Sequence, residues 1–205
     1  MKNLKFAAAG IVVCASMLFT ACSGGEKTEF VHSTVDSNGK FTCELLGIGA
    51  DFDTNVWEFF SDSDIASANG VSSASNEDLK SALSKSGALQ DMGALQEDGT
   101  NVLLIYEDTD VTKLGNVDES TYIDKSVNQL EAQLAGIVDN VKSEKTTVTV
   151  AGASHSALDV TGETSGVSIY SRTICIRKGN LVALISINAF SKETINEITS
   201  MFHAL

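Results

Sequence analysis

The last third of the chain alternates between apolar segments and very short polar connections, and this pattern constrains the fold most strongly. Strand-forming residues occupy four segments, 146–150, 154–161, 167–177 and 181–190. The connections at 162–166 and 178–180 are too short for a crossover, so neighbouring strands should pair antiparallel. The last of these strands begins with five consecutive apolar residues, which indicates a strand covered on both faces.

Earlier segments predict further strands and two short helices. Strands are expected at 41–45, 48–52, 56–60 and 101–106. A first helix should begin at the serine and aspartate residues of 61–64 and end at Gly70. A second helix should begin at Ser75, where the pattern Ser-x-x-Asp is typical of a capping box, and should end at Gly87.

The clearest helix covers 119–141. Its apolar residues recur at steps of four and three and form one stripe: Ile123, Val127, Leu130, Leu134, Ile137 and Val141. Because no further heptads flank this stripe, it favours packing on a sheet over a coiled coil.

A last helix, capped by Ser191, should turn its apolar residues to one side: Ile195, Ile198, Phe202 and Leu205. Together these elements predict one α+β domain over 30–205, an antiparallel sheet with helices on its faces.

The charge of the chain restricts its partners. The formal net charge is −13, and removal of the first 21 residues, which include Lys2 and Lys5 and no acidic residue, would leave −15. Such a surface repels nucleic-acid phosphates and anionic lipid headgroups. Nucleic-acid binding is therefore not expected.

The first 22 residues have the order of a secretory signal peptide. Lys2 and Lys5 precede an apolar stretch at 6–19 that is too short to span a membrane. The sequence Leu-Phe-Thr-Ala-Cys follows and ends at Cys22. It resembles the bacterial lipobox, in which an apolar and two small residues precede the cysteine that is acylated and becomes the mature N-terminus. Cys14 is a poorer candidate because two valines precede it.

The predicted mature protein begins at Cys22, which carries the lipid anchor, and continues as a polar, glycine-rich tether over 22–29. Two or three acyl chains on one residue give lasting membrane attachment. We therefore expect an extracytoplasmic lipoprotein, on the outer face of the plasma membrane in a Gram-positive cell, whose membrane contact is this lipid.

Two segments resemble lipoproteins common in Firmicutes. Residues 39–49 read Gly-Lys-Phe-Thr-Cys-Glu-Leu-Leu-Gly-Ile-Gly, and 57–70 read Trp-Glu-Phe-Phe-Ser-Asp-Ser-Asp-Ile-Ala-Ser-Ala-Asn-Gly. The strand run and the final helix are also similar to the end of those proteins. Members of this group resemble the α/β/α sandwich of PsbP and Mog1, which implies binding or assembly roles and no catalytic residue. The chain departs from the pattern at 53–57, where the family often has a proline before the tryptophan.

Only one local cluster suggests a hydrolase, Ser154-His155-Ser156 with Asp159. On a strand, Ser154 and His155 would point to opposite faces, and Asp159 would lie about 13 Å along the strand from His155. No Gly-x-Ser-x-Gly elbow is present. A solvated or hydrogen-bonded histidine is the favoured interpretation of His155.

No metal or cofactor is expected. The histidines at 32, 155 and 203 are scattered, and no Cys-x-x-Cys or phosphate-cradling glycine loop occurs. Calcium could suit the acidic residues at 107–110, or Asp51 with Asp53, but an EF-hand counted from Asp108 has Lys113 where glycine is required. A solvated acidic loop is favoured.

Trp57, the only tryptophan, permits two interpretations. The favoured one is a core residue that holds a helix to the sheet; the other is one wall of a ligand or partner groove. Cys43 and Cys175 also leave two possibilities, a disulfide or, as favoured, two separate buried thiols.

These features predict a membrane-anchored, non-catalytic binding or assembly module without a cofactor, whose partner is a protein or small molecule of unknown identity. The alternative is a cell-envelope or degradative enzyme with a dispersed active site. A concave pocket with converging polar groups would favour the enzyme, and a closed core with a flat surface the binding module.

Overall fold

The computed structural model describes residues 27–134 and 138–205. The predicted signal peptide, Cys14 and Cys22 lie outside these described residues. In chain order the elements are β1 (Thr34–Val35), β2 (Lys40–Cys43), β3 (Ile48–Asp51), β4 (Trp57–Phe59), α1 (Asp62–Ala68), α2 (Asn76–Ser86), β5 (Ala88–Gln96), β6 (Asn101–Asp108), α3 (Glu119–Leu134), β7 (Asp139–Val150), β8 (Ala153–Thr164), β9 (Val167–Lys178), β10 (Leu181–Ala189), α4 (Lys192–Met201) and β11 (Phe202–Ala204).

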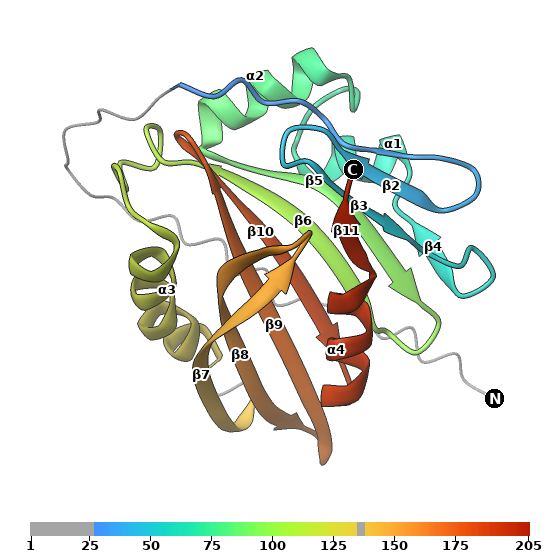
Figure 1. Ribbon diagram of the computed structural model, residues 1–205, viewed down its shortest axis with the longest axis vertical. Helices are drawn as coiled ribbons and strands as arrows, with labels where there is room; N and C mark the ends of the chain where they lie inside the picture. The colour runs from blue at the N-terminus through green and yellow to red at the C-terminus, as the bar shows by residue number, and fades with distance from the viewer. Residues whose placement is uncertain (1–26, 135–137) are drawn as a thin grey trace.

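The strands form two antiparallel sheets (Figure 1). The large sheet has the order β4-β5-β6-β10-β9-β8-β7, and the small sheet has the order β1-β2-β3-β11. The four long strands β7 to β10 follow one another in space, as their short connections predicted. Long-range pairing of β10 with β6 then joins this meander to the first half of the chain.

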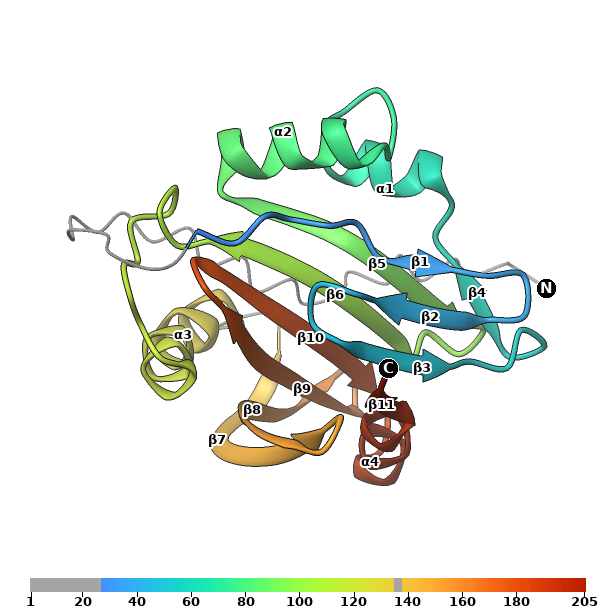
Figure 2. The same ribbon diagram turned by 45° about the horizontal axis from the view of Figure 1, so that its top comes forward.

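Both faces of the large sheet are covered (Figure 2). On one face, Leu104 and Tyr106 belong to a core that also contains the small sheet, α1, α2 and α4. On the other face, Leu103 and Ile105 pack with the apolar side of α3. The alternation along β6 explains why its sequence is apolar without interruption. The predicted α+β class, an antiparallel sheet flanked by helices, is confirmed, with the small sheet as an additional part of one layer.

The predicted helix ends are confirmed where local side-chain chemistry defines them. Ser61 caps α1 and forms a reciprocal capping box with Asp64. Ser75 caps α2, which ends at Gly87 with φ of 78°, and Ser191 caps α4.

Three boundaries differ from the sequence-based expectation. The helix predicted to reach residue 141 ends at Leu134, and Val141 lies in β7; residue 137 of the predicted stripe lies outside the described residues. Phe202 and Leu205, expected on the last helix, lie beyond it: Phe202 lies in β11, where it pairs with Ala50, and Leu205 follows β11. Strand β5 was not predicted at all, because Asp91 and Gly93 interrupt its apolar pattern. Among the described residues, no helix combines the length and the apolar character needed to cross a bilayer.

Candidate functional site

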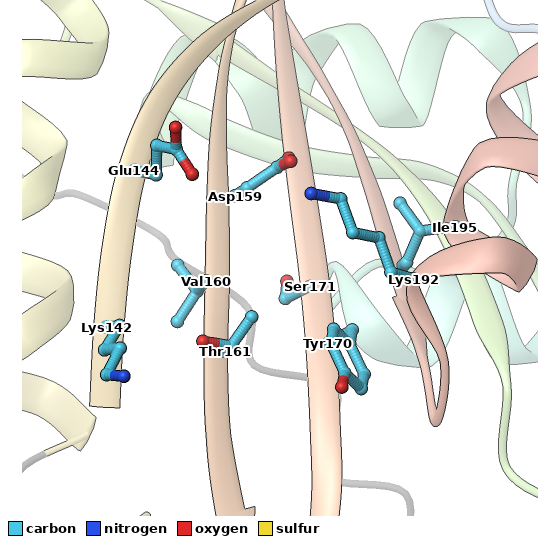
Figure 3. Close-up of a pocket in the computed structure, with 9 residues that line it drawn as sticks. All are labelled: Lys142, Glu144, Asp159, Val160, Thr161, Tyr170, Ser171, Lys192 and Ile195. Carbon is cyan, nitrogen blue, oxygen red and sulfur yellow. The ribbon is translucent and has the colours of Figure 1, made fainter. Parts of the chain in front are cut away.

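A cleft lies where β7, β8 and β9 curl toward the first turns of α4 (Figure 3). Its volume is about 140 Å³. The lining residues come from these four elements: Lys142, Glu144, Asp159, Val160, Thr161, Tyr170, Ser171, Lys192 and Ile195.

Strand register places the polar side chains of the cleft in two rows. Lys142 lies opposite Thr161, which in turn lies opposite Tyr170. In the next row on the same face, Glu144 lies opposite Asp159, which pairs with Arg172. Side chains that face each other across antiparallel strands lie within contact distance, so each row crosses the three strands β7, β8 and β9.

Arg172 fixes the floor of the cleft. Its Nε donates to Asp159 Oδ1 and its Nη2 donates to Asp159 Oδ2, both at 2.7 Å. Its Nη1 donates to Asn196 Oδ1 and Thr199 Oγ1 on α4. Arg172 is buried, with an exposed fraction of 6%. The bidentate pair with Asp159 joins β9 to β8, and the Nη1 hydrogen bonds hold α4 against them.

Charged side chains at the rim of the cleft are left open. Within residues 27–134 and 138–205, the side chains of Lys142, Glu144 and Lys192 make no hydrogen bond or ion pair. Figure 3 shows Lys192 extending over β9 toward Asp159, while Lys142 and Glu144 stand on β7. Tyr170 and Ile195 supply apolar surface in the same cleft. The cleft therefore combines a rigid floor with ammonium and carboxylate groups that are free to bind a ligand.

A second hollow, of about 170 Å³, lies between α3 and the β7–β8 hairpin. Lys145 at its edge already forms an ion pair with Asp124 at 2.7 Å. Because its principal charge is satisfied internally, this hollow has less to offer a ligand than the cleft.

The structure separates the residues of the suspected hydrolase cluster. Asp159 binds Arg172, and His155 Nδ1 instead contacts Glu119 Oε1 at 2.9 Å. Glu119 also accepts the backbone N–H groups of Ser156 and Arg177, and so joins the start of α3 to β8 and β9. His155 is thus hydrogen-bonded, in line with the favoured interpretation.

A pair between a half-buried histidine and a buried carboxylate occurs elsewhere, at His32 and Asp91. Asp91 lies at a bulge of β5, is 1% exposed, and also accepts the N–H of Ser33. The hydrogen bond to Asp91 raises the pKa of His32 above its ordinary value of 6.5, against the opposite effect of burial. Sequence reasoning missed this pair, because β5 was not predicted and nothing local connects residues 32 and 91.

The acidic segments act as turn-formers. Asp108 Oδ1 accepts from the N–H of Asp110 and from Asn180 Nδ2, and Asp53 Oδ1 accepts from Asn55. Across the described part of the chain, no three His, Cys, Asp or Glu side chains gather as they would around a metal ion.

Trp57 and the two cysteines lie in the core. Trp57 is 6% exposed and packs edge-on against Phe52, at the edge of the large sheet opposite the cleft. Cys43 and Cys175 are both buried and free, and they belong to the cores on opposite faces of the large sheet. The structure thus supports the core interpretation of Trp57 and the prediction of two separate thiols.

Comparison with known proteins gives only distant similarities. No protein-family profile matches the chain, and no curated protein sequence matches it. Among solved structures, the chain is similar to the cyanobacterial PsbP (CyanoP) of Synechocystis sp. PCC 6803, with 13% identity and a TM-score of 0.46, over 90% of this chain and 98% of that one. It is also similar to LpqN, a protein involved in cell envelope biogenesis of Mycobacterium tuberculosis, with 13% identity and a TM-score of 0.34, over 57% of this chain and 78% of that one. PsbP thus appears among the similar structures, whereas the Firmicutes lipoprotein type stays a prediction.

Proposed function

We propose that this protein is a lipid-anchored, extracytoplasmic binding module without catalytic activity, and that the cleft between β7, β8, β9 and α4 is its binding site. One observation carries the proposal. Lys142, Glu144 and Lys192 surround a preformed hollow, and no internal partner within the described residues neutralises them. Charged groups held open around a rigid floor favour recognition of a charged ligand.

The chemistry of the cleft indicates the kind of ligand. Two ammonium groups, on Lys142 and Lys192, outnumber the single open carboxylate of Glu144, since Asp159 is occupied by Arg172. Tyr170 and Ile195 offer apolar contact beside these charges. A small ligand, or the end of a larger one, that carries an acidic group on an apolar body fits this arrangement.

Several observations favour binding over catalysis. Among the described residues, the ring nitrogens of His32, His155 and His203 contact carboxylate or backbone oxygens and no hydroxyl or thiol. Covalent catalysis requires a nucleophile within reach of such a base. In the cleft itself, the ion pair with Arg172 leaves no carboxylate oxygen of Asp159 without a partner.

The test captures the ligand from the site. A photo-crosslinking amino acid replaces Thr161 inside the cleft or, as the control, Thr149, which is exposed on β7 outside it. On whole cells we expect a defined adduct from Thr161 and none from Thr149. The double variant Lys142→Gln/Lys192→Gln should reduce this adduct by about tenfold or more, because each charge-assisted hydrogen bond contributes at least that factor. A Lys40→Gln/Lys145→Gln control, with the same change in net charge, should not.

The same experiment separates the binding module from the enzyme. A ligand that is recovered chemically unchanged after incubation with the purified protein supports the proposal. Its conversion to a product would favour the alternative of an envelope enzyme. Equal adducts from Thr161 and Thr149 would show that the cleft is not the binding site.

A further inference from the structure

The chain enters the domain at one defined end of the molecule. The N–H of Thr28 donates to Asn180 Oδ1 at 2.7 Å, and Glu29 forms an ion pair with Lys80 on α2. Phe30 is 3% exposed and packs edge-on against Tyr106. The folded domain therefore begins at Thr28, two residues earlier than the predicted start at residue 30. The tether to Cys22 is correspondingly shorter.

Three other segments meet at this end. The N–H of Asp108 donates to the carbonyl of Gly87, which follows α2. The N–H of Thr109 donates to the carbonyl of Asn180 in the β9–β10 turn, both bonds being 2.9 Å long. Figures 1 and 2 both show the start of the described chain beside the end of α2, the β6–α3 loop and the β9–β10 turn.

Each of these four segments carries an exposed lysine. We call this end of the molecule the basic pole and define it by these four lysines: Lys27, Lys85, Lys113 and Lys178. No ion pair within the described residues engages any of the four. The acidic side chains nearby are Glu29, which is paired with Lys80, Asp108, which is half-buried and accepts from Asn180, and the exposed Asp110 and Asp118. Among the described residues, the four lysines therefore outnumber the exposed acidic groups without an ion pair.

The opposite end of the molecule is acidic. The β5–β6 turn exposes Glu97 and Asp98, and the residues around the β3–β4 connection expose Asp51 and Asp53. The net charge of −13 therefore conceals a charge asymmetry along the strands of the large sheet. The basic pole is therefore the end that would attract an extended anionic surface.

We propose that the basic pole rests on the anionic headgroups of the membrane to which the protein is anchored, an inference that depends on the proposed lipid anchor at Cys22. Five residue steps separate Cys22 from Lys27, so the tether spans at most about 18 Å. Headgroup charge attracts lysines within a Debye length, about 8 Å at physiological salt. A tether this short keeps the lysines of the basic pole near the membrane surface, where they can come within a Debye length of the headgroups.

This orientation deepens the proposed function, because it turns the cleft away from the membrane. On β9, Tyr170 in the cleft and Lys178 at the basic pole are eight residues apart, which corresponds to about 26 Å along the strand. The cleft would then face the outside of the cell, open to ligands.

The test uses the full mature protein in vesicles of phosphatidylcholine with phosphatidylglycerol and in vesicles of phosphatidylcholine alone. A membrane-impermeant amine reagent labels exposed lysines, and peptide mass spectrometry quantifies each site. We expect labelling of Lys85, Lys113 and Lys178 to fall about fivefold or more on the anionic vesicles, since one lysine near such a surface contributes about that factor. Labelling of Lys40, far from the pole, should not change.

Charge reversal supplies the matched comparison. Lys85→Glu/Lys178→Glu should abolish the lipid-dependent protection of Lys113, whereas Lys40→Glu/Lys145→Glu, with the same change in net charge, should retain it. The milder Lys85→Gln/Lys178→Gln variant should weaken the protection and serves if charge reversal prevents folding.

Flotation in high salt distinguishes the two proposals. A protein that floats with both vesicles but is labelled equally in both retains its anchor and overturns the orientation. A protein that does not float lacks the anchor, and the orientation falls with it.

Discussion

At the residue scale, two charged side chains in the interior connect helices to the large sheet. Arg172 ties α4 to β8 and β9 through Asp159, Asn196 and Thr199. Glu119, at the start of α3, accepts backbone N–H groups from both β8 and β9 where the two strands separate. Leaving one partner of such a pair buried without the other is strongly destabilising, so these contacts hold the curled end of the sheet in a single shape.

Replacement of Trp57 by alanine tests the aromatic core of the first half of the chain. The ring is buried against Phe52, so Trp57→Ala should lower the free energy of unfolding by about 3–5 kcal/mol. Chemical denaturation measures this loss. The neighbouring Val56→Ala is the control, because Val56 is 50% exposed and its truncation should change stability little. Equal effects of both changes would contradict the core assignment.

The His32–Asp91 pair makes stability depend on pH. Asp91 raises the pKa of His32 in the folded state, with Asp62 acting in the same direction, while the unfolded histidine keeps a value near 6.5. A raised folded pKa adds stability that is complete below the unfolded pKa and is lost as the pH rises through the folded pKa. The free energy of unfolding should therefore decline as the pH rises above about 6.5.

Two histidine variants check this origin. His32→Asn should remove the decline, whereas His203→Asn, at an exposed site, should preserve it. Denaturation curves recorded across this pH range measure both. If the free energy of unfolding of His32→Asn still declines over this pH range, another titrating group causes the decline.

At the element scale, the sequence predicts what neighbouring residues determine. Ser61, Ser75 and Ser191 cap helices because a hydroxyl binds N–H groups within one turn. By contrast, Val141 and Phe202 continue a helical spacing but lie in strands, since pairing of β7 with β8 and of β11 with β3 outweighs it. The partner of β11 lies far away in the sequence, and although β8 directly follows β7, the local pattern around Val141 does not show that β7 already begins there.

Two glycines with similar backbone angles separate conformational strain from crowding. Gly87 has φ of 78°, and an added Cβ would lie 2.8 Å from Thr112 Cγ2; Gly47 has φ of 71° with open space around it. Gly47→Ala should cost about 1 kcal/mol from the left-handed conformation alone. Gly87→Ala should cost at least about 1 kcal/mol more, because the β6–α3 loop must shift. Equal losses in thermal or chemical denaturation would contradict this packing.

At the scale of the whole molecule, the cleft depends on contacts between segments that are distant in the sequence. The cleft could not be predicted, because Lys142 and Glu144 lay between a predicted helix and a predicted strand, and Lys192 follows much later. Only the register of β7, β8 and β9 and the docking of α4 bring them together. The general architecture was accessible, since short connections alone required antiparallel neighbours.

The two faces also decide the state of the cysteines. Cys43 and Cys175 are buried in cores separated by the sheet, and burial raises the pKa of both thiols. Neither should react with a thiol reagent in the native protein, and both should react after denaturation without reductant. Titration of thiols in the two conditions measures this; no reactive thiol after denaturation would indicate a disulfide.

The central claim, a binding module held at the membrane by lipid, depends most directly on Cys22. Its measurement is the intact mass of the protein extracted from membranes, together with its N-terminal peptide. We expect a chain that begins at Cys22 and carries diacylglycerol on that residue, and an unprocessed, lipid-free form in Cys22→Ala, while Cys14→Ala is processed normally. A mature protein that begins elsewhere, or that carries no lipid on Cys22, would contradict the account.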